Sequence, residues 1–187
     1  SINDSLMANK VDSIGNFAVH LEVAHLIGGV ANPDNAFAIS DVLATGVTDF
    51  FGSPENRKFN INHASQSFLN IIVQPGDRFS FLKHMGKVDS TTGYEKELVI
   101  INGDSTVPQY GGGMCQVSST LFRTVFFAGL KVLKRSSHSF EVKYYLPAGL
   151  DATVADYAPD LVFENDTPNL VLVQNLVDLK RTKMYFK

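Results

Sequence analysis

The chain has one cysteine and no tryptophan among its 187 residues, and its net charge at pH 7 is only −3. A single cysteine cannot form a disulfide within the chain, so a disulfide-stabilised scaffold is excluded. Charges of either sign are not gathered in blocks, and we therefore expect no nucleic-acid partner. No stretch approaches the roughly 20 apolar residues that a membrane-spanning helix requires, so we expect no membrane span in this chain.

Patterns that hold metals and phosphates are also lacking. One cysteine and scattered histidines do not give the short ligand spacings of a structural zinc site. The glycines at 111–113 are not followed by the lysine of a phosphate-binding loop. We therefore expect no metal and no cofactor. The first residues, SINDSLMANK, show no charged-then-apolar leader, and we expect any export signal or anchor to lie outside this sequence.

The residues that are present predict an α+β fold. Hydrophobic residues make up 44% of the chain, which is typical of a globular protein with its own core. Apolar spacing predicts helices early in the chain, over 14–30, 33–44 and up to about residue 73. Irregular structure is expected over 75–113, then a helix beginning at Cys115, a strand over 138–146 and further short strands. Helices followed by a run of strands favour an antiparallel sheet packed on the helix that begins at Cys115.

The cysteine stands at the start of that helix, in the stretch GGGMCQVSSTLF. Unpaired N–H groups and the helix dipole favour the thiolate there and lower the pKa of a cysteine. The three preceding glycines, Gly111, Gly112 and Gly113, allow an extended substrate or an oxyanion to approach the backbone. We expect these glycines, with Gln116 and Ser118, to bind substrate. The alternative is a buried and inert cysteine at a glycine-rich turn.

A histidine follows at a useful distance. His138 lies 23 residues after Cys115 (138 − 115), at the start of the predicted strand, on the face that also carries Phe140 and Val142. An imidazole there can take the proton of the thiol, as in other Cys–His pairs. The alternative is a core histidine that bonds a backbone carbonyl.

Two aspartates are candidates to orient that histidine. If Pro147–Gly149 form a tight hairpin, Asp151 would be roughly 20 Å from the imidazole, at ~3.3 Å per residue. We therefore rank Asp160 first and Asp151 second as the third member of a catalytic group. Either aspartate alone could instead cap a turn or a strand end.

Several segments resemble the VanW-like domain family, over about residues 45–173. They include NRKFNINHAS, PGDRFSF, GYEKELVIINGD, VPQYGGGMCQVSSTL and YYLPAGLDATV, in that order. The resemblance implies an exported bacterial protein of the cell envelope, most often in Gram-positive organisms. It also implies that 1–44 is the helical end of a preceding segment and that 45–187 is the VanW-like domain. The family takes its name from an accessory member of some glycopeptide-resistance clusters, and it supplies no established activity.

A fainter similarity concerns the order Cys, His, Asp, which resembles that of transglutaminase-like cysteine enzymes. No Trp follows His138, which departs from their pattern. Two hypotheses result. In the first, the protein is an envelope enzyme that uses Cys115 as nucleophile on an amide of peptidoglycan peptides, by hydrolysis or transpeptidation. In the second, it is a non-catalytic module that binds the cell wall or serves as a scaffold. The first requires an accessible thiol of low pKa beside an imidazole, and the second requires a buried, unreactive thiol.

Overall fold

The protein is described by a computed structural model that covers residues 41–101, 105–139 and 141–187. The helices expected over 14–30 and 33–44 fall wholly or largely outside these residues. The first half of the described chain contains β1 (Gly46–Asp49), α3 (Glu55–Ser65), η2 (Gln66–Phe68), β2 (Ile71–Val73), β3 (Arg78–Ser80), α4 (Phe81–Met85), η3 (Ser90–Thr92), β4 (Lys96–Ile101) and β5 (Ser105–Tyr110). The second half contains α5 (Met114–Phe127), β6 (Lys131–Lys134), η4 (Lys143–Tyr145), β7 (Val162–Glu164), β8 (Val171–Val173), β9 (Asn175–Asp178) and β10 (Lys183–Phe186).

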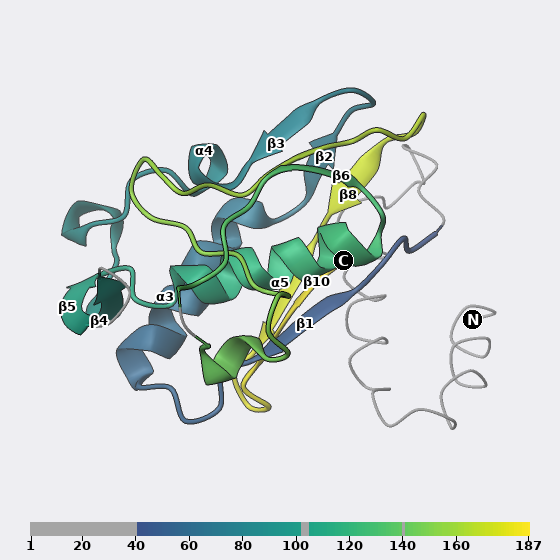
Figure 1. Ribbon diagram of the computed structural model, residues 1–187. Helices are drawn as coiled ribbons and strands as arrows, with labels where there is room; N and C mark the ends of the chain where they lie inside the picture. Colours follow the sequence, from purple (N-terminus) through teal and green to yellow (C-terminus); the bar gives the residue numbers. More distant parts are fainter. Residues whose placement is uncertain (1–40, 102–104, 140) are drawn as a thin grey trace, which may run out of the picture. The chain divides into compact units, whose positions relative to one another are not determined.

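The fold is α+β, with α5 through its centre (Figure 1). Within the part of the chain that the structure describes, four small sheets lie around this helix in place of the single sheet that we expected. Their strand orders are β1-β10-β9, β2-β8, β3-β7-β6 and β4-β5, and every pairing is antiparallel. Eleven residues of α5 are buried, which is why its sequence is apolar or small on almost every side.

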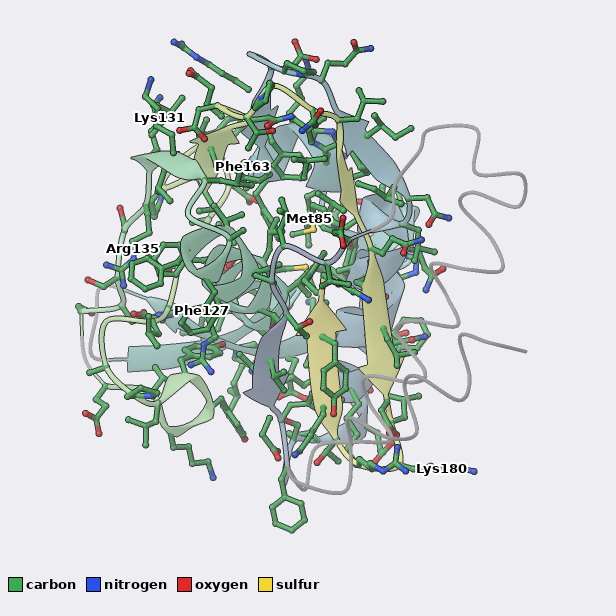
Figure 2. The ribbon with its side chains drawn as sticks, turned by 90° about the vertical axis from the view of Figure 1, so that its right-hand side faces the viewer. Met85, Phe127, Lys131, Arg135, Phe163 and Lys180 are labelled. Carbon is green, nitrogen blue, oxygen red and sulfur yellow. The ribbon has the colours of Figure 1, made fainter. Side chains whose placement is uncertain are left out.

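The core lies between α5 and the sheets. Phe79 of β3 stacks on Phe163 of β7 with ring centroids 4.8 Å apart, and Phe68 stacks on Phe81 at 4.5 Å. Figure 2 shows Phe163 and Met85 toward the interior and Lys180 at the periphery, in keeping with the burial of the first two side chains. No helix within the described part of the chain combines the length and the apolar character needed to cross a membrane.

Strand β1 lies against α5 at very close range. The N–H of Gly46 donates to Thr124 Oγ1 over 3.0 Å, and the hydroxyls of Thr48 and Thr120 are 2.5 Å apart. A Cβ on Gly46 would overlap both Thr124 Oγ1 and the carbonyl oxygen of Thr120. Only glycine therefore allows β1 to lie this close to α5.

We predict that Gly46→Ala lowers the free energy of unfolding by about 3 kcal/mol, because the added methyl forces β1 away from a packed helix. Urea unfolding measures the change. The control is Gly52→Ala, where φ is +75° and a Cβ meets nothing within 4 Å, so that only backbone strain of about 1 kcal/mol is expected. Equal losses in the two variants would contradict the close packing of β1 on α5.

Three sequence expectations about local structure are wrong. The helix expected up to residue 73 ends at Ser65, and residues 71–73 form β2. The region 75–113 is not irregular, because it contains β4 and β5, two strands of six residues each that pair antiparallel. Residues 138–146 form no strand where they are described: 138, 139, 141 and 142 are irregular, and η4 follows. The physical reason for the last difference lies in the side chains that take up the backbone groups of this segment, as described below.

Candidate active site

Helix α5 begins one residue before the cysteine, so the expected position of Cys115 in the first helical turn is confirmed. Gly113 precedes the helix with φ +116°, a conformation that favours glycine. A Cβ on Gly112 would lie 2.7 Å from Glu97 Cβ, and one on Gly113 would lie 3.0 Å from Ile61 Cγ1. The glycines thus let the turn before the cysteine pack tightly on α3 and β4.

The Cys115 side chain keeps partial solvent access and meets polar groups from the segment after residue 150. Its sulfur lies 3.6 Å from Thr153 Oγ1 and 3.5 Å from the carbonyl oxygen of Val154. The imidazole of His138 also lies close enough to this sulfur to lower the pKa of the thiol. The structure therefore brings together the cysteine and the histidine that the sequence paired.

The other side of the His138 ring faces Asp151. Nδ1 of His138 lies 2.5 Å from Asp151 Oδ2, and the backbone N–H of His138 donates to the same oxygen over 2.8 Å. Nη2 of Arg135 donates to Asp151 Oδ1 over 2.9 Å, so both carboxylate oxygens are engaged. Because Nδ1 bonds Asp151, the other ring nitrogen, Nε2, is the one that can exchange a proton with the thiol.

Of the two aspartates considered, the one ranked second lies at the histidine. The expected separation of roughly 20 Å between Asp151 and the imidazole is wrong, because residues 138–151 do not form a tight hairpin. Asp160, which was ranked first, accepts hydrogen bonds from Ser80 Oγ at 2.7 Å and from the N–H of Leu82 at 3.0 Å. These bonds fix the start of α4, and neither of them involves His138.

Arg123 sets the path of the chain between the histidine and Asp151. This buried side chain of α5 donates to the carbonyls of Tyr145, Leu146 and Leu150 over 2.6, 3.0 and 2.9 Å, and also to that of Val47 over 2.8 Å. These bonds use backbone acceptors that a strand ladder would otherwise take up. Together with the Asp151 carboxylate on the N–H of His138, this explains why the alternating pattern of 138–146 does not become a strand.

Charge in the site favours the thiolate and the imidazolium. Burial raises the pKa of Cys115, but the hydrogen bond and the charge of His138 outweigh burial and leave the pKa below its usual value. Burial lowers the pKa of His138, while the bonds to Cys115 and then to Asp151 raise it above its usual value. The pKa of Asp151 is lowered overall, because the His138 bonds and Arg135 outweigh its burial. Each of these directions favours the charged form of its group: the thiolate of Cys115, the imidazolium of His138 and the carboxylate of Asp151.

Several residues expected to bind substrate make internal contacts instead. Gln116 and Ser118 are fully buried. Gln116 accepts from Arg57 over 2.8 Å, and Ser118 donates to the carbonyl of Ala152 over 2.6 Å. Their side chains therefore fix the helix start against its neighbours and do not face solvent. A role for Gly111–Gly113 in substrate binding stays a prediction.

The sequence did not indicate the residues that surround the pair. The ring of Tyr145 stacks on His138 with centroids 4.8 Å apart and an interplanar angle of 28°. Arg135, labelled in Figure 2, follows β6 and places its guanidinium 4.9 Å from the centre of the Phe122 ring. An arginine that bonds within the fold is not distinguishable in sequence from one that faces solvent, so no local signal could have found Arg135 or Arg123.

Comparison with known proteins identifies the family. The family model described as "VanW like protein" matches residues 56–186, further toward the C-terminus than the resemblance noted in the sequence. An uncharacterised protein, YoaR of Bacillus subtilis, is 38% identical over 132 residues, which are 71% of this chain and 43% of that protein. The vancomycin B-type resistance protein VanW of Enterococcus faecalis is 34% identical over 122 residues, 60% of this chain and 42% of that protein.

The chain thus spans less than half the length of these two relatives. No solved structure matches it significantly, so the similarity to transglutaminase-like enzymes stays a prediction. The family match alone covers well over half of the chain and contains every residue of the site described above, from Cys115 to Asp151. This chain belongs to the VanW-like protein family.

Proposed function

We propose that the protein is a cysteine-dependent enzyme of the bacterial cell envelope that cleaves or transfers an acyl group at amide bonds of peptidoglycan peptides. The observation that carries the proposal is the series Cys115, His138, Asp151: His138 acts on the thiol at the start of α5, and its Nδ1 bonds Asp151. Such a series, with a nucleophile, a base and a carboxylate that orients the base, is the arrangement that nucleophilic acyl transfer requires.

The chemistry follows from the geometry. The Cys115 thiolate attacks the carbonyl carbon of the amide, and the C–S bond forms as the π electrons move to the oxygen. The oxyanion then collapses, the C–N bond breaks, and the leaving amine takes the proton of His138. A water or an amine next attacks the thioester, His138 takes its proton, and the thiolate leaves. Asp151 keeps the imidazole oriented and stabilises its charge during both steps.

The backbone before and at the cysteine supports an oxyanion site. The N–H groups of Met114 and Gln116 donate to the carbonyls of Gly111 and Gly113, over 3.1 and 2.9 Å. The N–H of Cys115 lies between them in the first turn, where helical N–H groups have no acceptor within the helix. Such a group, close to the sulfur, is suited to bind the developing negative charge on the substrate oxygen.

The substrate class and the location are supported by the relatives. One of them is named a vancomycin-resistance protein, and vancomycin resistance concerns the cell wall. Peptidoglycan contains amide-linked peptides that a thiolate can attack. On this basis we place the protein outside the cytoplasm, at or near the cell wall, with residues 45–187 as the catalytic domain and 1–44 as the end of a preceding segment.

The test is to detect the covalent intermediate and the product. Muropeptides from Gram-positive peptidoglycan are incubated with the wild-type protein and with Cys115→Ala, and both protein and peptides are analysed by mass spectrometry. We expect an acyl adduct on Cys115 and new cleaved or cross-linked peptides from the wild type alone. A wild-type protein that binds peptidoglycan in pull-down experiments, yet forms neither adduct nor product, would support the binding module instead.

A further inference from the structure

Arg57 of α3 is a buried cation whose hydrogen-bond partners among the described residues are all neutral. The residue is 8% exposed. Its guanidinium donates to Ser53 Oγ over 2.7 Å, to Gln116 Oε1 over 2.8 Å and to Tyr145 Oη over 3.3 Å. It also lies 4.2 Å from the centre of the Tyr144 ring. A buried charge is costly unless its surroundings compensate it, so this placement calls for a reason beyond packing.

The two partners of one nitrogen, Nη2, belong to the two halves of the site. Gln116 directly follows the nucleophile, and its amide is held at its other end by the carbonyl of Asp49, at 3.3 Å. Tyr145 is 6% exposed, and its ring forms the stacked backing of His138. A single guanidinium therefore joins the helix turn that carries the thiol to the ring that supports the imidazole.

We propose that Arg57 is a positioning residue: through Gln116 and Tyr145 it fixes the His138 ring at hydrogen-bonding distance from the Cys115 sulfur. The inference rests on the proposed function, because it concerns the same Cys–His pair. An arginine suits the role because its planar guanidinium can hold two acceptors at fixed directions, whereas a lysine ammonium is a point charge on a flexible stem. Burial raises the pKa of Tyr145 above its ordinary value, so the phenol is uncharged at neutral pH while its oxygen accepts from Arg57.

The groups that face the pair determine how the proposal can be tested. His138 meets Asp151 on one side and Tyr145 on its face, Cys115 meets His138 and Thr153, and Arg57 stands behind Tyr145. If Arg57 acts by position, its loss loosens the thiolate–imidazolium contact, so the pKa of Cys115 rises and that of His138 falls. If Arg57 acted only by its charge, its loss would raise both pKa values, because a nearby cation favours a thiolate and opposes an imidazolium.

The experiment measures both groups in Arg57→Lys, Arg57→Met and Tyr145→Phe. The pH dependence of Cys115 alkylation by iodoacetamide gives the thiol pKa, and NMR of histidine-labelled protein gives that of His138, assigned with His138→Gln. Arg78→Lys, an exposed arginine paired with Glu164, is the matched control. Thermal unfolding confirms that each variant is folded, and Tyr145→Phe keeps the stacked ring in case Arg57→Met does not fold.

We expect Arg57→Lys, Arg57→Met and Tyr145→Phe each to raise the alkylation midpoint by about one pH unit, which is tenfold in rate below the midpoint. The pKa of His138 should fall, and the double variant Arg57→Lys/Tyr145→Phe should change no more than the larger single one. Restoration of the midpoint by lysine, or a rise of both pKa values, overturns the positioning role. A low wild-type midpoint that no variant moves also overturns it. An ordinary wild-type midpoint near ~8.5 instead contradicts the proposed function itself.

Discussion

His138→Gln should slow the alkylation of Cys115 at pH 6 by on the order of 100-fold, because the midpoint of the reaction rises by about two pH units. In the wild type, His138 outweighs the burial of the thiol and lowers its pKa. Without His138, only the weaker contacts with Val154 and Thr153 oppose burial, and the midpoint should rise toward ~8.5 or above. Stopped-flow labelling with iodoacetamide between pH 4 and 10 measures both profiles.

The control is the same substitution at a histidine away from the site. His84→Gln removes a half-buried ring that stacks on Phe79 and leaves Cys115 untouched. Its labelling profile should coincide with that of the wild type. If Cys115 reacts only after unfolding, in wild type and variants alike, the thiol is a packing residue and the binding module becomes the better hypothesis.

Asp151→Asn should reduce turnover of a peptidoglycan peptide by about 10² to 10⁴-fold, whereas Asp160→Asn should leave turnover unchanged. Loss of the carboxylate removes the group that bonds Nδ1 and the backbone N–H of His138, so the ring loses its orientation and its charge is no longer stabilised. Asp160 instead bonds Ser80 and Leu82 at the start of α4, and neither of these bonds involves the histidine. Each variant exchanges one carboxylate oxygen for an amide nitrogen, so Asp160→Asn is a matched control for Asp151→Asn.

The contacts of Asp151 with His138 and Arg135 should also affect the pH dependence of stability. The pKa of Asp151 is lower in the folded protein than in the unfolded chain, so its carboxylate stabilises the fold above the unfolded value of about 3.9. This contribution is lost as the pH falls through the folded pKa. The difference in unfolding free energy between wild type and Asp151→Asn should therefore shrink as the pH is lowered from 7 to 3, as measured by urea unfolding. A difference that stays constant over this range would show that Asp151 is not held as a carboxylate by His138 and Arg135.

The inferred role of Arg57 is consistent with a second buried polar residue on the same face of α3. Asn60, one turn further along this helix, donates to the carbonyls of Glu95 and Gly112 and accepts from the N–H of Glu95. Asn60 thus fixes the glycine turn before Cys115, while Arg57 joins the residue after Cys115 to the ring that stacks on His138. Helix α3 supports the site from behind without contributing a reacting group.

The sequence by itself determined the local setting of Cys115. Glycines followed by a helical apolar pattern place Cys115 in a first turn, because capping and periodicity are properties of adjacent residues. The pairing of Cys115 with His138 could also be predicted, since the chain has one cysteine and His138 lies in a suitable apolar pattern. The family was recognisable from the same segments, in particular GGGMCQVSSTL.

Only the tertiary structure decided which aspartate completes the series and what holds the pair in place. The position of Asp151 depends on the path of residues 138–151, and Arg123 fixes that path by bonding Tyr145, Leu146, Leu150 and, from the distant strand β1, Val47. The links of Arg57 to Gln116 and Tyr145 join residues 59 and 88 positions apart. Contacts over such separations arise from packing of the whole chain, and no periodicity or spacing within the sequence records them.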